Sequence, residues 1–596
     1  MPRFGALIGS WGGTKAVQGD GHGQGGPSQP WWTDLLLLAG IGGLGWGMLH
    51  VAGQWHDVKH DAVDISLSPW MLPWYTFLSL SRGMAAYLIS LVFTLVYGFW
   101  AAKDPRAERI LIPVLDILQS IPVLGFMPGL VLALVALFPN TNTGLELAAV
   151  LMIFTGQVWN MTFSFYRSLQ TVPREQREAA AIFGFGWFRV FRQVELPSST
   201  LGLVWNSMMS MAGGWFFLSV SEAFTLGNKD FRLPGLGSYM SEAALHDNYL
   251  AQFYGIVAMV LMIVLLDQLL WRPLVAWAQK FRTEEGSAGE APTSWFLDLL
   301  RKSRLPDAIH ARLTAKSGTI VVPKKVAPAP CPTPDAKPGL WSWTLIPLGL
   351  LLAGMSWGGW MLFLQLLKVH AANWIEIGED TGLTLVRVVT ATFLATLWTV
   401  PAGLAIGLSP KLSRIFQPII QVVASFPAPM LFAIAMTAMT WIGIHFFGTD
   451  SVLGIGSVLL MLLGTQWYIL FNVIAGSMAI PTDLREAATA YHFTPMQRFR
   501  LVYLPAIFPA LVTGWVTAMG GAWNASIVAE VVTFHDKQVS TPGLGSLIAA
   551  AATDIENQAP VLIASVLTMA AVVVGINRLL WKRLYRLAET RFSLEK

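Results

Sequence analysis

The chain has 596 residues, of which 54% are hydrophobic and only 12% are charged, and its mean hydropathy is +0.54. A soluble protein of this size carries about a quarter charged residues, so this composition leaves too little polar surface to face water and favours an integral membrane protein. The net charge of +4 indicates no nucleic-acid partner, and the single cysteine, Cys331, excludes an internal disulfide.

Residues 1–33 are rich in Gly and polar residues and lack a hydrophobic core flanked by a cleavage site. They are predicted to form a disordered cytoplasmic tail and not a signal peptide.

About twelve apolar stretches follow, each long enough to cross a hydrocarbon layer as a helix of roughly 20 residues. In the first half they lie near 34–52, 74–101, 110–138, 145–168, 200–226 and 250–272. In the second half they lie near 342–367, 382–408, 415–446, 452–477, 507–533 and 560–581. The third stretch of each half contains prolines (Pro122 and Pro128; Pro427 and Pro429), which predict a kinked or broken helix.

Lys and Arg gather in alternate loops, after the second, fourth and sixth stretch of each half. Such loops stay in the cytoplasm, so both termini and the linker at 276–340 are predicted to be cytoplasmic. The linker is rich in Pro, Ala and Lys and contains a possible short helix near 293–303. The predicted domains are two membrane units at 34–275 and 341–585, joined by this linker and followed by a cytoplasmic tail at 586–596.

The two halves repeat each other. The same residue types recur 305 positions later early in each half and 308 positions later from residue 156 onward. The pairs include Arg82/Arg387, Gly98/Gly403, Pro113/Pro418, Pro122/Pro427, Gly156/Gly464, Trp159/Trp467, Pro173/Pro481, Glu222/Glu530 and the segments 234–237/542–545. Six spans per copy make the repeat parallel, with its pseudo-two-fold axis along the membrane normal, and place a transport pathway at the seam.

The loop after each fourth stretch carries the most specific motif. It reads REAAAIFGFGWFRVFRQVELP at 177–197 and REAATAYHFTPMQRFRLVYLP at 485–505, with the same Glu-to-Pro spacing in both copies. This pattern resembles the Glu-Ala-Ala loop of permease subunits of binding-protein-dependent type I ABC importers. Small Ala side chains allow a helix to sit close to a partner surface, and the acidic side chain suits a helix start.

The resemblance implies that a short helix in each loop docks into a groove on an ATPase subunit and transmits its closure. The implied coupling residues are Glu178, Ala179, Ala180 and Gly184 in the first copy and Glu486, Ala487, Ala488 and His492 in the second. His492 replaces the glycine of the pattern. A turn that needs positive φ would be strained there, so the two docking sites are expected to differ in affinity.

A finer resemblance points to the nitrate/taurine/bicarbonate branch of these permeases. It covers both halves but not the tail or the linker, and it rests on QSIPVLGFMP (119–128), ASFPAPM (424–430) and the segments LPGLG and TPGLG. The solute implied is a small anion such as nitrate, a sulfonate or bicarbonate.

Charged residues near the outer ends of the spans form matched sets. Arg82 is predicted to pair with Glu222, and Arg387 with Glu530, because an unpaired charge at membrane depth is costly. These pairs are either structural salt bridges or part of a translocation pathway in which an arginine attracts an anion. Trp215 and Trp523 lie deeper, beside glycines that favour close helix packing; a gate in the pathway is the alternative.

No P-loop, His-Glu-x-x-His motif, cysteine cluster or Gly-x-Ser-x-Gly elbow occurs in the sequence. The chain is therefore expected to be no enzyme, to hold no metal or cofactor, and to depend on a partner ATPase that binds ATP and Mg.

The resulting prediction is an all-α integral membrane protein made of two tandem six-helix permease units of the type I importer fold, in a bacterial inner membrane. Its expected partners are two ATP-binding cassette subunits on the cytoplasmic side, a periplasmic or lipid-anchored solute-binding protein, and the bilayer. Two alternatives stay open: an importer of a neutral or cationic vitamin precursor, and a secondary transporter or channel that works without ATP.

Overall fold

The fold was analysed in a computed structural model, which describes residues 31–56, 64–226, 229–281, 294–302, 345–447, 453–534 and 537–592. The chain divides into two compact units. Unit 1 comprises Met1–His56, Phe163–Met208 and Val264–Gly339, and unit 2 comprises Asp57–Thr162, Met209–Ile263 and Leu340–Lys596. Most of the predicted tail at 1–33 and most of the linker at 276–340 lie outside the described residues.

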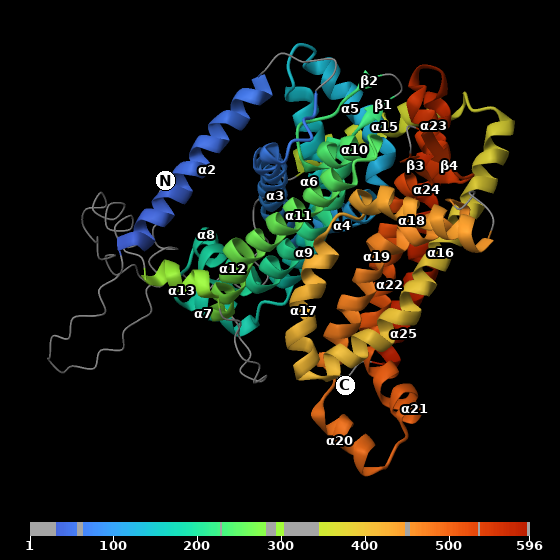
Figure 1. The fold of residues 1–596 in the computed structure, drawn as a ribbon. Helices are drawn as coiled ribbons and strands as arrows, with labels where there is room; N and C mark the ends of the chain where they lie inside the picture. The colour runs from blue at the N-terminus through green and yellow to red at the C-terminus, as the bar shows by residue number, and fades with distance from the viewer. Residues whose placement is uncertain are drawn as a thin grey trace. The chain divides into compact units, whose positions relative to one another are not determined.

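The first half of the chain is a series of helices (Figure 1). They are α2 (Trp31–His56), α3 (Leu72–Lys103), α4 (Pro105–Ser120), α5 (Val123–Leu137), α6 (Thr143–Gln170), α7 (Arg174–Ile182), α8 (Trp187–Val190), α9 (Leu196–Glu222), α10 (Leu236–Leu245), α11 (Tyr249–Leu266), α12 (Arg272–Ala278) and α13 (Trp295–Lys302). The short 3-10 helices η1 (Pro69–Met71) and η4 (Gln279–Phe281) and the π-helical segments η2 (Phe191–Glu195) and η3 (Asp267–Trp271) complete it. Helix α13 confirms the short helix predicted in the linker.

The second half repeats this order. Its helices are α15 (Leu345–Leu366), α16 (Ala371–Leu408), α17 (Pro410–Ser425), α18 (Phe432–Ile442), α19 (Leu453–Met478), α20 (Thr482–Ala490), α21 (Pro495–Gln497), α22 (Leu504–Ala529), α23 (Leu544–Thr553), α24 (Ile555–Ile576) and α25 (Lys582–Arg591). It also contains the 3-10 helix η5 (Ala428–Leu431) and the π-helical segments η6 (Gly443–Phe447), η7 (Arg498–Tyr503) and η8 (Asn577–Trp581). The predicted all-α class is confirmed.

Two small antiparallel hairpins, which the sequence analysis did not predict, add the only strands of the described residues. They are β1 (Thr225–Leu226) with β2 (Lys229–Asp230), and β3 (Val531–Phe534) with β4 (Lys537–Ser540). Each hairpin follows the fifth long helix of its half, α9 or α22, and leads into the Pro-Gly-Leu-Gly segment. The hairpins therefore return the chain toward the C-terminal end of the same helix, where the N–H of Leu233 donates to the carbonyl of Glu222 and the N–H of Thr541 to the carbonyl of Glu530.

Nine helices among the described residues are long and apolar enough to cross a membrane, and the bent pair α4 and α5 makes a tenth. Helices occupy all twelve predicted positions, but α2 and α9, of 26 and 27 residues, are not among these ten. In α9 several Ser residues, an Asn and a terminal Glu lower the hydropathy, since a helix packed inside a bundle carries polar groups on its buried side.

The third predicted span is broken in both halves. In the first half α4 and α5 are bent by more than 40° around Ser120–Pro122, and in the second half α17 ends at Ser425, just before Pro427. Proline lacks the amide hydrogen needed to continue a helix, and it disfavours helical geometry at the preceding residue. The prediction of a kinked or broken third helix is confirmed.

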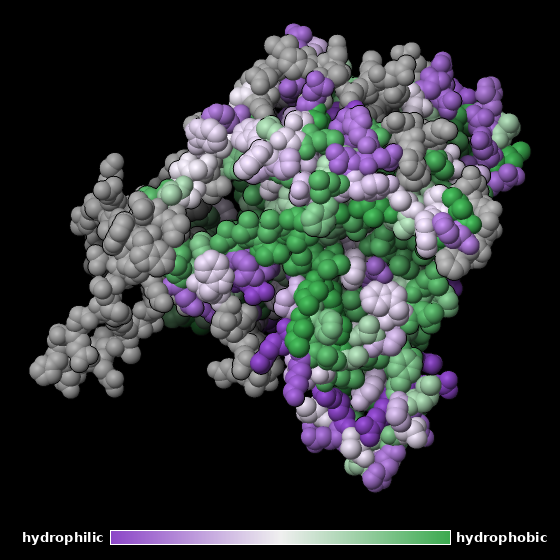
Figure 2. All heavy atoms as spheres, viewed as in Figure 1, coloured by the Kyte–Doolittle hydropathy of each residue, from purple (hydrophilic) through white to green (hydrophobic). Residues whose placement is uncertain are grey.

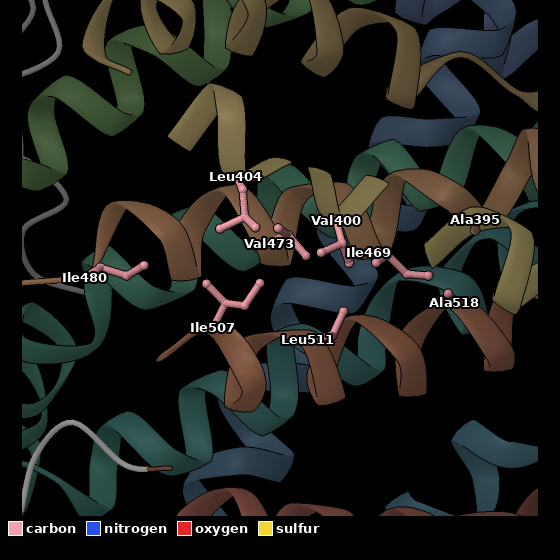
Figure 3. Close-up of a cluster of buried hydrophobic side chains, with 9 residues drawn as sticks. All are labelled: Ala395, Val400, Leu404, Ile469, Val473, Ile480, Ile507, Leu511 and Ala518. Carbon is pink, nitrogen blue, oxygen red and sulfur yellow. The ribbon is translucent and has the colours of Figure 1, made fainter. Parts of the chain in front are cut away.

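The core of the second half lies where α16, α19 and α22 run side by side (Figures 1 and 3). The buried residues of this cluster are Ala395, Val400, Leu404, Ile469, Val473, Ile480, Ile507, Leu511 and Ala518. A Cβ added at Gly514 of α22 would lie 3.0 Å from the Cα of Ile469, so this glycine allows α22 to approach α19 closely.

The two compact units do not coincide with the two predicted six-helix domains, because unit 2 contains segments of both halves. Within unit 2 the backbone N–H of Val123, at the start of α5, donates to Asn524 Oδ1 of α22 at 2.8 Å. A Cβ added at Gly125 would collide with Val566 of α24. Helix α5 thus packs directly on helices of the second half.

The surface of unit 2 has a hydrophobic middle and hydrophilic ends (Figure 2). On the face shown in Figure 2, hydrophobic side chains cover the middle of the long helices, while hydrophilic ones gather around α23 at one end and around α20 and α21 at the other. Helix α22 connects these ends; its 26 residues span about 39 Å at 1.5 Å per residue. The loop that carries Glu486 and the charged residue Glu530 therefore lie at opposite ends of unit 2.

Candidate functional site

The first predicted coupling segment, in unit 1, is helix α7. Pro173 precedes its first turn, and the helix ends in a Schellman motif. The N–H of Gly184 donates to the carbonyl of Ala181 and the N–H of Phe185 to the carbonyl of Ala180, both at 3.0 Å. This motif places its closing residue in the left-handed region, and Gly184 has φ 63°.

The second segment, α20 in unit 2, has the same architecture. The N–H of His492 donates to the carbonyl of Thr489 at 3.0 Å, and the N–H of Phe493 donates to the carbonyl of Ala488 at 3.1 Å. His492 has φ 52°, so a side chain with a Cβ occupies the position that Gly184 occupies in the first copy. The predicted positive φ is confirmed, and the turn that ends α20 is strained.

In each of the two motifs, one alanine is buried and the other is exposed. Ala180 and Ala488 are buried against their own units, whereas Ala179 and Ala487 are exposed. The acidic residues Glu178 and Glu486 are exposed too, and no hydrogen bond or ion pair joins either to another described residue. Each helix therefore packs against its own unit through one alanine and exposes a carboxylate and a second alanine on the protein surface.

A hollow of about 460 Å³ lies beside α7 in unit 1. Its walls include Gln176, Ala179, Phe183, Phe185, Val194 and Phe281. The neighbouring side chains of Ile182 and Phe183 are 74% and 73% exposed. Apolar groups exposed beside a hollow are typical of a surface that another protein covers.

Replacing His492 with glycine is expected to stabilise the end of α20 by about 1 kcal/mol, because glycine adopts positive φ without the Cβ clash. Hydrogen exchange at residues 482–493 should slow roughly fivefold, which is the factor that corresponds to this energy. Gly184→Ala is the reciprocal control and should speed exchange at 174–185, since open space around Gly184 leaves only the backbone strain. Unchanged exchange in both variants would contradict the strain.

In unit 2, Arg82 of α3 lies at the centre of a buried ion cluster. Its Nε donates to Glu146 Oε2 at 2.6 Å and its Nη2 to Glu146 Oε1 at 2.7 Å, a two-pronged contact. Its Nη1 donates to Glu222 Oε1 at 2.8 Å and to the carbonyl of Pro234 at 2.7 Å. Arg82 is 1% exposed, so its charge is compensated entirely by the protein.

Glu222 is held from other directions as well. Ser79 Oγ donates to Glu222 Oε1 at 2.7 Å, and the N–H of Gly237 donates to Oε2 at 2.8 Å. A Cβ at Gly235 would overlap the carboxylate of Glu222, so only glycine allows the turn to lie this close. Charge-assisted hydrogen bonds thereby join the Pro-Gly-Leu-Gly turn to Arg82 of α3 and to Glu222 of α9.

The second half contains a related cluster around Arg387. Arg387 Nη1 donates to Glu530 Oε1 at 2.9 Å and to the carbonyl of Pro542 at 2.7 Å. Thr384 Oγ1, in the place of Ser79, donates to Glu530 Oε1 at 2.8 Å. Both predicted pairs, Arg82 with Glu222 and Arg387 with Glu530, are confirmed as contacts; a role in translocation remains a prediction.

The sequence analysis missed Glu146, which contacts Arg82 more extensively than Glu222 does. The signal was an acidic residue in the first turn of an apolar membrane helix, where a charge needs a partner. It also missed the hydroxyls of Ser79 and Thr384, which look like ordinary small polar residues of a membrane helix.

Trp215 and Trp523 are both buried in unit 2, at 2% and 1% exposure. A Cβ at Gly83 would lie 2.8 Å from Trp215 Cζ3, so a glycine of α3 makes room for this ring. Trp523 Nε1 has no hydrogen-bond partner among the described residues. The burial of both rings agrees with the packing interpretation, and a gating role stays a prediction.

No group of three or more His, Cys, Asp or Glu side chains within the described ranges is arranged to hold a metal ion.

Comparison with known proteins extends these observations. The sequence model of one family, described as "Binding-protein-dependent transport system inner membrane component", matches twice, at residues 94–270 and 399–591. The two matches confirm the internal duplication.

Individual relatives include the taurine transport system permease protein of Escherichia coli (strain K12), 28% identical over 181 residues, which are 30% of this chain and 60% of that protein. The nitrate import permease protein of Leptolyngbya laminosa is 27% identical over 162 residues, 26% of this chain and 54% of that protein. A bicarbonate transport system permease protein of Synechocystis sp. is 26% identical over 161 residues, 26% of this chain and 54% of that protein. The chain thus spans little more than half the length of these relatives.

Proposed function

The chain belongs to the family of binding-protein-dependent transport system inner membrane components, and from this premise we propose that it supplies both membrane halves of an ATP-driven importer for a small anion. Two partner ATPase subunits bind the cytoplasmic loops, and they hold the ATP and Mg. A solute-binding protein, periplasmic or lipid-anchored, delivers the anion to the opposite face. The chain itself is a transport subunit and not an enzyme.

The observation that carries this proposal is the repetition of one docking element in both halves. Helices α7 and α20 share the preceding proline, the buried second alanine, the outward acidic residue and the Schellman turn. A pair of equivalent helices suits a pair of equivalent motor subunits. Because α20 and the hairpin β3–β4 lie at opposite ends of unit 2, force applied at the loop reaches the outer end along α22.

Two observations support an anion as the transported solute. The names of the relatives describe permeases for taurine, nitrate and bicarbonate. The outer end of each half holds an arginine in a polar setting, Arg82, which is buried, or Arg387, which is partly exposed. The proposed location is a bacterial inner membrane with both termini in the cytoplasm, and the proposed domains are the membrane units 34–275 and 341–585.

In the proposed cycle, ATP binding closes the two ATPase subunits and brings the docking helices together. The two membrane halves then tilt so that their seam opens outward and receives the anion. Hydrolysis of ATP lets the docking helices separate and returns the seam to the inward-open state. Both halves lie in one polypeptide, so one chain per transporter suffices.

Reconstitution tests the proposal. Proteoliposomes that contain the chain, a co-purified ATPase and the binding protein should accumulate nitrate, taurine or bicarbonate only when ATP is present. The matched control is the same chain without the ATPase, which should show no uptake above empty vesicles. Uptake at the full rate without the ATPase would identify a secondary transporter or channel, and ATP-driven uptake of a neutral or cationic solute alone would overturn the anion.

A further inference from the structure

The two ion clusters of unit 2 differ in one carboxylate. In the first half, one arginine meets two carboxylates, Glu146 and Glu222. In the second half, Glu530 is the one carboxylate among the described residues that forms an ion pair with Arg387. The residue 308 positions after Glu146 is Gly454, and the residue 308 positions after Leu233 is Thr541.

Gly454 occupies the place of Glu146 in space as well as in sequence. It lies in the first turn of α19, as Glu146 lies in the first turn of α6. Among the atoms of the described residues, Thr541 Oγ1 alone lies within 4 Å of a Cβ added there, at 3.9 Å. Thr541 Oγ1 in turn accepts a hydrogen bond from Arg387 Nη2 at 3.0 Å. Position 454 therefore faces the Arg387 cluster, and no described side chain fills there the place that Glu146 fills in the first half.

The guanidinium of Arg387 correspondingly donates fewer hydrogen bonds to the described residues than that of Arg82 does. In the first half, the Nε and Nη2 edge of Arg82 grips both oxygens of Glu146. The same edge of Arg387 has Thr541 on Nη2, and its Nε donates to no acceptor in the part of the chain that the structure describes. Arg387 is 12% exposed, against 1% for Arg82. The side chain of Arg387 is thus less enclosed than that of Arg82.

We infer that the open edge of Arg387, beside Gly454 and Thr541, binds a small planar oxyanion in the position that the Glu146 carboxylate occupies in the first half. Nitrate, bicarbonate and carboxylates have two oxygens spaced to accept from Nε and Nη2 together. The site lies in the first turn of α19, where the helix dipole favours negative charge. The first half demonstrates that this fold accommodates the extra carboxylate.

Two features set the expected affinity. Asp380, two turns earlier on α16, interacts electrostatically with Arg387 and repels an incoming anion. The site is also open and gripped by one arginine, so binding on the order of 1 mM is expected. Weak binding suits a site from which a transported ion must leave again. The transport meaning of the site rests on the proposed function, whereas the binding itself does not.

The test uses the purified full-length chain in nanodiscs of zwitterionic lipid, with sodium nitrate titrated against sodium chloride at constant ionic strength. Nitrate, and formate as a second planar probe, should raise the melting temperature of the wild-type chain with a saturating dependence. Sulfate, which is tetrahedral, should act more weakly. Absence of any nitrate-specific change up to about 100 mM would overturn the inference, since that is roughly a hundredfold above the expected Kd.

Variants at the two equivalent positions make the test specific. Gly454→Glu installs the missing carboxylate and should weaken nitrate binding at least about tenfold, whereas the matched control Gly454→Ala should change it less than about twofold. Glu146→Gly opens the corresponding space beside Arg82 and should lower the melting temperature in chloride and recover it in nitrate or formate. Equal nitrate binding by wild type and Gly454→Glu would contradict the site.

Glu146→Gly is also the independent arm if Gly454→Glu does not assemble, because it tests the same exchange in the opposite direction. None of these measurements requires the ATPase or transport. A chain that binds nitrate as described but supports no ATP-driven uptake would disprove the proposed function and leave the site intact. ATP-driven anion uptake with no nitrate-dependent stabilisation would do the reverse.

Discussion

Replacing Arg82 with methionine is expected to destabilise the chain by about 3 to 5 kcal/mol, the largest effect of any single substitution proposed for it. Methionine fills a similar volume but leaves the carboxylates of Glu146 and Glu222 buried together with no cation between them. Two like charges in a low-dielectric setting repel each other in addition to losing their partner. Thermal unfolding of the purified chain, followed by intrinsic fluorescence, measures the loss.

Arg387→Met is the matched variant and should cost less, about 1.5 to 3 kcal/mol. It leaves one carboxylate, Glu530, which still accepts from Thr384 Oγ1 and from the N–H groups of Gly545 and Ser546 at 2.8, 2.8 and 3.2 Å. The double variant Arg82→Met, Glu146→Gly recreates that arrangement in the first half and should be as stable as Arg387→Met. Equal losses for the two single variants would show that the second carboxylate does not matter.

This cluster also limits how the anion pathway is tested. Charge reversal at Arg82 would place a third carboxylate beside Glu146 and Glu222, so loss of uptake would follow from misfolding alone. Charge reversal at Arg82 therefore cannot serve as a test of the pathway. Arg387 is partly exposed and less enclosed, so a charge reversal there is expected to affect uptake without preventing assembly.

Reversing the charge of both outward acidic residues, Glu178→Arg with Glu486→Arg, is expected to lower ATP-dependent uptake by at least about tenfold and to release the ATPase on purification. Both side chains are exposed and contact no described side chain through a hydrogen bond or ion pair, so the chain itself should unfold at an unchanged temperature. Uptake in proteoliposomes and recovery of the ATPase with a tagged chain measure the two effects.

The control for this variant lies one turn earlier on the same helices. Glu175 and Asp483 occupy equivalent positions, are exposed and carry the same charge, but lie outside the Glu-Ala-Ala motif. Their reversal to arginine should leave at least half of the uptake. If both double variants lost uptake equally, the general charge of the loops would matter and not the motif.

Much of the architecture follows from the sequence because the signals are local or repeated. Apolar length predicts where helices form, Pro427 and its counterpart Pro122 predict where the third one breaks, and the two offsets of the repeat predict equal helix orders. The strained residue His492 was predictable for the same reason. A glycine in one copy marks a backbone position that needs positive φ, and the other copy must adopt the same turn.

The tertiary structure was needed to find the second carboxylate, Glu146, that contacts Arg82. The equivalent depth of Arg82 and Glu222 predicted their contact, but Glu146 lies on a different helix, and no periodicity links it to Arg82. Its partner follows from how α3, α6 and α9 pack, which depends on side-chain volumes at many contacts at once. For the same reason the vacancy beside Arg387 cannot be read from Gly454, which in sequence is one of many glycines in membrane helices and becomes informative only when its neighbour in space, Thr541, is known.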